Sequence, residues 1–175
     1  GHIAFNFAVV LLALPVAGRT HAVVLSLLSR SAVPPADLAP ATALDDSVLG
    51  SPSLALANVT REVVKICGDL ETMLDTVIGL YETPDDNLMD MVARLDDRID
   101  LSHSEIKLYL ARLAQSRVDV ATTQRMQELL TACIALEQAG DVASTNLTAH
   151  ARRKHDRGLS FSPEGWLELV DLHSL

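Results

Sequence analysis

The chain has 175 residues with 14 basic and 23 acidic side chains, which gives a formal net charge of −9. This charge argues against duplex nucleic acid as a partner, because the phosphate backbone is bound mainly by Lys and Arg. Aromatic residues make up only 3% of the chain, which also disfavours a stacking surface for single strands. The length is that of one core-forming domain with an appendage.

The first 30 residues are strongly apolar at their start. Ile3–Gly18 contains no charged residue and would extend about 24 Å as a helix, less than the ~30 Å of a bilayer core. Arg19 and Arg30 follow, and basic residues beside a membrane segment favour the cytoplasmic side. The chain has no initiating Met, so we expect a fragment in which residues 1–30 end a transmembrane domain of the inner (plasma) membrane. Residues 31–175 are then cytoplasmic. The alternative is a buried helix of a soluble protein.

Residues 31–52 contain four prolines and no sustained periodicity, which predicts a linker. Apolar residues then repeat at helical spacing over about residues 53–82, 84–115 and 120–154. Thr83 and Pro84 are typical of an N-cap and first helical position. Short joins between long amphipathic helices predict an all-α fold, an antiparallel three-helix bundle over residues 53–160.

A fourth helix is expected to begin at Ser162-Pro163-Glu164 and to stop with the chain. The two cysteines, Cys67 and Cys133, both fall on apolar helix faces and are expected to be buried, reduced thiols.

Two acidic residues interrupt the apolar stripe of the third helix. Glu137 and Asp141 lie one turn apart, in line with five apolar positions: Met126, Leu129, Leu130, Cys133 and Ile134. Carboxylates aimed at a core need a metal ion, a cationic neighbour or water to neutralise them. The alternative is that this end of the helix is exposed, and spacing alone favours that alternative.

Other polar residues give weaker signals. Asp96 and Asp100 flank the apolar stripe of the second helix and are interpreted as a solvated face, and His103 as a packed or half-exposed histidine. The sequence shows no nucleophile–base constellation, phosphate loop or paired Glu-x-x-His motif, so we expect no catalytic or cofactor-binding residues and no enzyme activity.

Five segments in order resemble the bacterial sodium–phosphate (Na/Pi) cotransporter family: HIAFNFAVVLLALP (2–15), LDDSVLGSPSLALANVTREV (44–63), EIKLYLARL (105–113), ALEQAGDVASTNL (135–147) and GLSFSPEGW (158–166). The resemblance implies the last helix of a membrane domain followed by half of a six-helix, PhoU-like regulatory domain. Residues 53–160 would be one three-helix repeat, and residues 161–175 the start of a truncated second repeat.

The same resemblance implies a function, partners and a site. The function would be sodium-dependent transport of inorganic phosphate, with sodium and phosphate bound by a missing transporter domain. The partners would be the lipid membrane and a second PhoU-like repeat or another protomer. Glu137 and Asp141 match the Glu/Asp-x-x-x-Asp motif by which the PhoU family is implicated in binding metal ions, so the resemblance implies a divalent metal ion at this motif and no other cofactor. The alternative function is a membrane-anchored helical signalling or adaptor protein of phosphate homeostasis without transport activity.

Overall fold

The structure, a computed structural model, describes residues 42–174. All the regular secondary structure in these residues is helical, and no strand occurs among them. The elements are η1 (Asp46–Val48), α2 (Pro52–Glu82), α3 (Asp86–Leu113), α4 (Val120–Asp141), η2 (Val142–Leu147), α5 (Thr148–Asp156) and α6 (Pro163–His173). The membrane segment expected within residues 1–30 lies outside the described residues. Among the helices that are described, none is long and apolar enough to cross a membrane.

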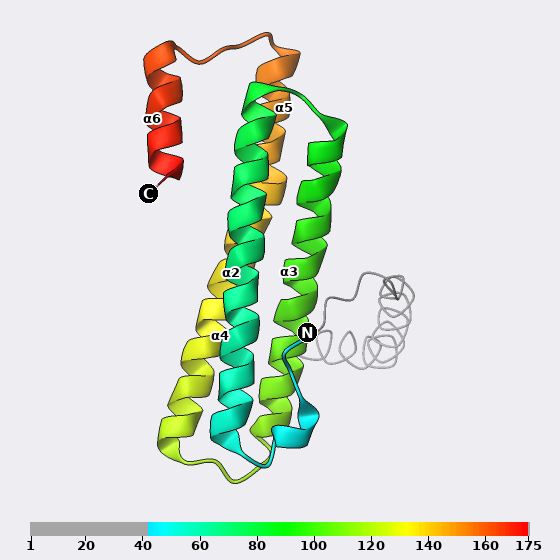
Figure 1. Ribbon diagram of the computed structural model, residues 1–175, viewed down its shortest axis with the longest axis vertical. Coiled ribbons are helices and arrows are strands. Elements are labelled where there is room, and N and C mark those ends of the chain that lie inside the picture. The colour runs from blue at the N-terminus through cyan, green and yellow to red at the C-terminus, as the bar shows by residue number, and fades with distance from the viewer. Residues whose placement is uncertain (1–41, 175) are drawn as a thin grey trace, which may run out of the picture. The chain divides into compact units, whose positions relative to one another are not determined.

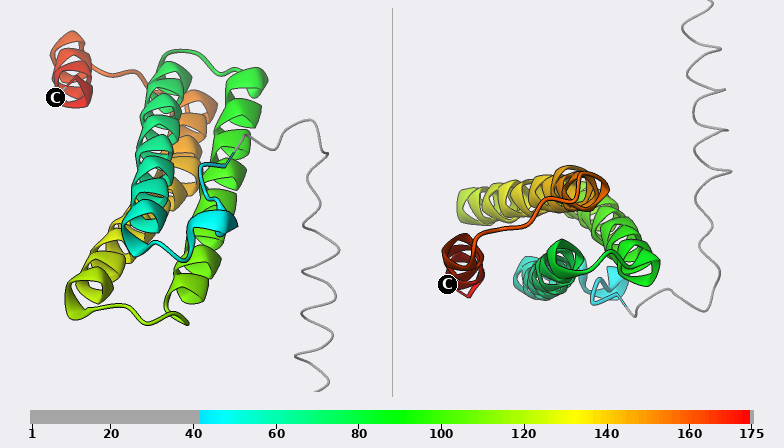
Figure 2. Two further views of the ribbon diagram at one scale, coloured as in Figure 1. Left: turned by 60° about the horizontal axis from the view of Figure 1, so that its bottom comes forward. Right: turned by 90° about the horizontal axis from the view of Figure 1, so that it is seen from above.

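The long helices form the predicted antiparallel three-helix bundle. Helix α2 runs antiparallel to α3, and α4, η2 and α5 follow one another as a single helical path that returns beside α2 (Figure 1). The same three rods are seen from the end in Figure 2. Helix α2 packs against α3, α4 and α5, so it is the element on which the other two rods meet.

The core is built from the apolar stripes that the sequence predicts. Each of the three rods contributes aliphatic side chains, and Tyr109 of α3 is fully buried among them. The largest fully buried aliphatic side chains are those of Val59, Ile66, Met73, Val77, Val92, Ile99, Ile106 and Leu113.

The junction between α2 and α3 differs from the prediction. Thr83 is the C-cap of α2, and its amide donates to the Gly79 carbonyl at 3.1 Å. Asp85, two residues later, caps α3 by accepting from the Asn87 amide at 2.8 Å. The carboxylate of Asp85 is therefore the group that satisfies the first turn of α3, and Pro84 remains in the connection.

The third rod is not a uniform α-helix. It contains a π-helical turn, η2, between α4 and α5, and the Thr148 hydroxyl donates to the Ala143 carbonyl five residues earlier at 3.1 Å. The rod ends in a Schellman motif, in which the Gly158 amide donates to the His155 carbonyl and the Leu159 amide to the Lys154 carbonyl. Gly158 has φ 61°, a left-handed conformation that this motif requires.

The short helix α6 begins where the sequence predicts. Ser162 caps it by accepting from the Gly165 amide at 3.0 Å, and Pro163 is its first residue. Its far end is tied to α2, since the His173 Nε2 lies 2.7 Å from the Asp75 carboxylate.

The two cysteines do not share one environment. Cys133 is buried as predicted, and burial, with Glu137 adding, raises the pKa of its thiol to about 11. Cys67 is exposed, so the prediction for it is wrong. Cys67 lies about 100° further around α2 than the fully buried Ile66, so its side chain lies beyond the edge of the packed face.

Glu62 is a buried acidic residue that joins three parts of the fold. Its side chain is 1% exposed and accepts from the Ala43 amide at 2.9 Å, the Lys65 ammonium at 2.9 Å and the Ser102 hydroxyl at 3.2 Å. Burial opposes ionisation, but these three donors outweigh it and lower the pKa of Glu62. The carboxylate therefore holds the segment before α2, α2 itself and α3 together.

Replacing Glu62 should be costly, because its donors would be left buried without an acceptor. We expect Glu62→Ala to lower the free energy of unfolding at pH 7 by about 2–3 kcal/mol, measured by urea denaturation. The exposed Glu71 of the same helix gives the control, and Glu71→Ala should change stability little.

The same residue predicts a pH dependence. Since its pKa is lowered in the folded state, ionised Glu62 stabilises the fold above its unfolded pKa of about 4.3, and that stability is lost as pH falls through the lowered value. Glu62→Gln should weaken this acid dependence. An unchanged acid limb in the stability–pH curve would contradict this role.

Candidate metal centre

Three carboxylates meet on the surface where α3 and α4 lie together. Glu137 and Asp141 lie one turn apart on α4, as the sequence predicts, and Asp100 of α3 joins them. One oxygen from each carboxylate lies within 4.8 Å of the others. Within the described part of the chain, neither Glu137 nor Asp141 has an ion pair with a cationic side chain.

Asp100 was not predicted as part of this group. The sequence indicates a solvated face for Asp96 and Asp100, and Asp100 is indeed exposed. Its side of α3, however, borders α4. The available signal was that Asp-x-x-x-Asp spacing occurs on one helix and Glu-x-x-x-Asp on the next, but only the pairing of the two helices shows which members meet.

Gly140 lies at the contact between α4 and α3, next to these acids. It is buried against α3, and a Cβ atom built at this position would lie 3.5 Å from Ile99 Cδ1 and 3.8 Å from Asp96 Oδ1. The buried face of the rod thus passes through Cys133, Gly140 and Ala143. Small residues here allow close approach, and the acidic groups flank the contact.

This placement corrects the interpretation of the apolar stripe. Glu137 is half-buried and Asp141 exposed, so neither points into the core. Ile134, which was placed in the same stripe, is also exposed. The packed face of α4 runs instead through Met126, Leu129, Cys133 and Gly140.

The acidic groups repel one another. Burial raises the pKa of Asp100, and Asp96, Asp141 and Glu137 raise it further, while His103 opposes them. The pKa of Asp96 is raised first by burial and then by Asp141 and Asp97, against a hydrogen bond from Ser144. This surface therefore favours a positive charge.

The geometry of the three carboxylates, hereafter the acidic triad (Asp100, Glu137, Asp141), fits a hard cation. Two oxygens bound to one Ca²⁺ at about 2.3–2.6 Å lie at most about 5 Å apart, which the spacing of the triad satisfies. Oxygen-only ligands suit Mg²⁺, Ca²⁺ or Mn²⁺ better than a metal that prefers thiolate or imidazole. Three carboxylates leave several coordination positions for water or other groups, so affinity in this chain should be modest.

His103 lies beside the triad but is not one of its members. It is half-buried, as expected, and its Nε2 has no hydrogen-bond partner among the described residues. Its charge matters to the triad only through its effect on Asp100.

The triad predicts opposite responses to metal and to neutralisation. With chelator present, Asp100→Asn should raise the free energy of unfolding at pH 7 by about 0.5 kcal/mol, because it removes like-charge repulsion at an exposed site. The pKa of Asp100 is raised, so the contribution of this one residue to stability is fully present below its unfolded pKa and is lost as pH rises through the folded value. In Asp100→Asn, the part of the pH dependence of the unfolding free energy that comes from Asp100 should be absent.

With added Ca²⁺ or Mn²⁺, the parent protein should become more stable than Asp100→Asn, the reverse of the order expected in chelator. The parent protein should gain thermal stability with increasing cation, and Asp100→Asn or the pair Glu137→Gln with Asp141→Asn should gain much less. Isothermal titration gives the affinity directly. Equal cation binding by parent and triad variants would rule the triad out as the ligand set.

Comparison with known proteins gives these helices a family. Residues 63–147 match the model of the family described as PhoU domain. The match includes all three members of the triad. No solved structure gives a significant match.

Curated relatives extend the similarity beyond the domain. The chain is 33% identical over 132 residues to the "Putative inorganic phosphate export protein YjbB" of Salmonella typhimurium. It is 30% identical over 130 residues to the proteins of the same name in Escherichia coli strain K12 and Shigella flexneri. In each case the match covers 74% of this chain and 24% of the relative, so the chain spans about a quarter of the length of these proteins. Residues 63–147, the helical stretch that contains Asp100, Glu137 and Asp141, are thus a PhoU domain in a chain homologous to these proteins.

Proposed function

We propose that this chain is the PhoU-domain part of a protein that transports inorganic phosphate. The observation that carries the proposal is the similarity over 132 residues to a relative named for phosphate export, which is a longer stretch than the PhoU match itself. Phosphate homeostasis is the role common to the family match and the names of the relatives.

The membrane part of the proposal rests on the sequence. The uncharged run Ile3–Gly18, followed by Arg19 and Arg30, favours the end of a transmembrane domain with residues 31–175 on the cytoplasmic side. In this arrangement the PhoU domain regulates or supports transport and performs no catalysis. Sodium drives the transport, as the resemblance to sodium–phosphate cotransporters implies.

The acidic triad supplies a regulatory element to this proposal. Divalent cation bound by Asp100 of α3 and by Glu137 and Asp141 of α4 would remove the repulsion between the two helices. A second PhoU-like repeat or another protomer could add ligands and cover the exposed apolar residues of α6, Leu167 and Leu172. Cation binding would then stabilise the assembled domain.

A membrane-anchored adaptor of phosphate homeostasis without transport activity is the second candidate. It is retained because the similarity covers only 24% of each relative, and this quarter contains the PhoU match. Movement of labelled phosphate by the protein from the complete gene distinguishes the two candidates.

Transport should depend on both the protein and sodium. Expression of the complete gene in a host that lacks its own phosphate transporters should confer movement of labelled phosphate across the membrane. Replacing sodium by choline should lower the rate at least about tenfold if the ion is the driving partner. Phosphate movement without sodium dependence would retain the transporter and reject symport, and no movement at all would favour the adaptor.

The triad should act on regulation. The variant Asp100→Asn, Glu137→Gln, Asp141→Asn should change how the transport rate responds to cytoplasmic divalent cation or to phosphate supply. Its control, Glu71→Gln, Asp90→Asn, Glu168→Gln, neutralises three exposed acids elsewhere. Identical responses of the two variants would remove the triad from the proposed mechanism.

A further inference from the structure

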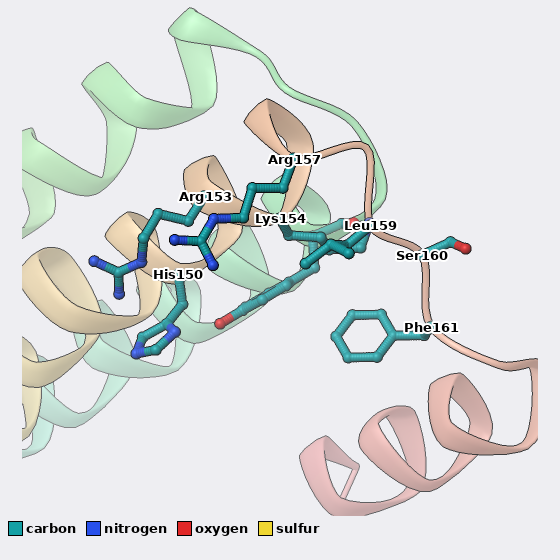
Figure 3. A pocket seen from close by; sticks show the side chains of 8 residues that line it. His150, Arg153, Lys154, Arg157, Leu159, Ser160 and Phe161 are labelled. Atoms are coloured by element: carbon teal, nitrogen blue, oxygen red, sulfur yellow. Dashed lines mark hydrogen bonds between the residues drawn. The ribbon is translucent and has the colours of Figure 1, made fainter.

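A basic pocket lies at the C-terminal end of the third rod, where α5 ends and the chain turns towards α6. It is open to solvent and has a volume of about 580 Å³. Tyr81, near the end of α2, is one lining residue. The remaining ones follow in one stretch of chain: His150, Arg153, Lys154, Arg157, Leu159, Ser160 and Phe161 (Figure 3). We call it the basic pocket.

Its charge is unusual for this chain. Arg153, Lys154 and Arg157 line it together with His150, and no acidic residue does, although the whole chain carries a net charge of −9. Cations in the last turn of a helix normally complement its dipole, which amounts to about half a negative charge. Three full cations exceed that requirement, so the dipole alone does not account for them.

The cations of the basic pocket are not all engaged in the fold. The Lys154 ammonium donates to the Tyr81 carbonyl at 2.8 Å and lies 5.5 Å from the centre of the Phe161 ring, so it supports the wall. Arg153 and Arg157, one turn apart, have no ion pair within the described residues. Figure 3 shows their guanidinium groups on the same side of the pocket as the His150 ring, with Phe161 across from them.

Tyr81 marks the boundary between the charged and apolar sides. Burial raises the pKa of its hydroxyl, and the charge of Arg153 opposes that effect, which is consistent with a guanidinium close to the phenol. The Tyr81 and Phe161 rings have centroids 5.8 Å apart, and Phe161 lies at the same distance from Trp166. The aromatic side is therefore supported from α6.

The apolar side is left partly open. Leu159 is 57% exposed and Phe161 is 41% exposed, although both line the basic pocket. The Schellman motif at Gly158 fixes where these residues leave the helix, since it turns the chain directly after Arg157. Phosphate alone would use only the cationic side of a pocket in the size range of organic ligands.

We propose that the basic pocket binds a nucleoside phosphate. The guanidinium groups of Arg153 and Arg157 are suited to paired hydrogen bonds with phosphate oxygens. The Phe161 ring is partly exposed and gives the pocket an aromatic group against which a base can stack, and base–aromatic stacking tolerates different bases. Nothing in this chemistry depends on whether the complete protein moves phosphate.

ATP is the probe, measured by isothermal titration against the complete chain in about 0.15 M salt, where long-range attraction between exposed charges is screened. Chelator is included so that a metal-bound nucleotide does not bind the acidic triad. Arg153→Ala with Arg157→Ala should weaken ATP binding at least about tenfold, and Phe161→Ala should weaken it several-fold.

A matched control separates the basic pocket from general charge. Arg117→Ala with Arg152→Ala removes the same total charge from two exposed residues that do not line the basic pocket, and it should leave ATP affinity within about twofold. Circular dichroism of each variant checks that the bundle remains folded. Lys154 and His155 remain in the variant Arg153→Ala with Arg157→Ala, so the end of α5 keeps basic residues that complement the helix dipole.

Pyrophosphate and adenosine are the comparison ligands, and both should bind more weakly than ATP. The proposal is overturned if ATP does not bind, if the pocket and control variants weaken it equally, or if pyrophosphate binds as tightly as ATP. Equal loss in the two arginine variants would indicate attraction to overall charge, and equal affinity for pyrophosphate would indicate a site that does not recognise a base.

Discussion

The buried polar contacts between α2 and α3 fix how these two helices are aligned, and the candidate metal centre depends on that alignment. Glu62 of α2 accepts from Ser102 of α3, and Asp69 of α2 pairs with Arg98 of α3. Aliphatic packing tolerates a shift of one helix along another, but a shift here would take the buried carboxylates of Glu62 and Asp69 away from their partners on α3, at a cost in free energy. Asp100 lies between Arg98 and Ser102 in sequence and projects elsewhere around the helix. The contacts with α2 therefore also set the height at which Asp100 meets α4.

The carboxylates of Glu62 on α2 and Asp100 on α3 have pKa values shifted in opposite directions. Glu62 is nearly inaccessible, yet its pKa is lowered, because three donors from the protein surround it. Asp100 is exposed, yet its pKa is raised, because its carboxylate is partly desolvated and its neighbours are acids. The first carboxylate is neutralised within the fold and stabilises it. The second remains uncompensated, which is the expected state of a group whose counter-charge comes from solution.

Much of the architecture could be predicted from the sequence because it follows from the spacing of apolar residues. The three rods and the start of α6 at Ser162 are where the periodicity and caps place them. Predictions failed where several local signals competed or where a helix had to be rotated to its final contact. Thr83 and Asp85 both resemble caps, and the carboxylate of Asp85 took the role. Cys67 was assigned to a stripe whose packed edge ends at Ile66.

The candidate site shows the same limit more clearly. Glu137 and Asp141 were recognised from one helix, but Asp100 required knowledge of which helix lies beside them. Gly140 lies on the buried face of α4 and packs next to Ile99 of α3. A periodicity argument counts Gly140 as a weak helix former and gives it no packing role. The packing of α3 against α4 therefore determines which third carboxylate joins the triad and how exposed the triad is. This packing cannot be read from either helix alone.

The acidic triad and the basic pocket belong to the same helical rod but should act as separate sites. Asp141 ends α4 and Arg153 lies in α5, with the π-helical turn η2 between them. At about 1.5 Å per residue these positions are some 18 Å apart along the rod, about twice the Debye length at physiological salt. Direct attraction between a bound cation and a bound anion is therefore small. Any influence of one site on the other has to pass through the packing of the rod against α2, which contacts α4, η2 and α5 in turn.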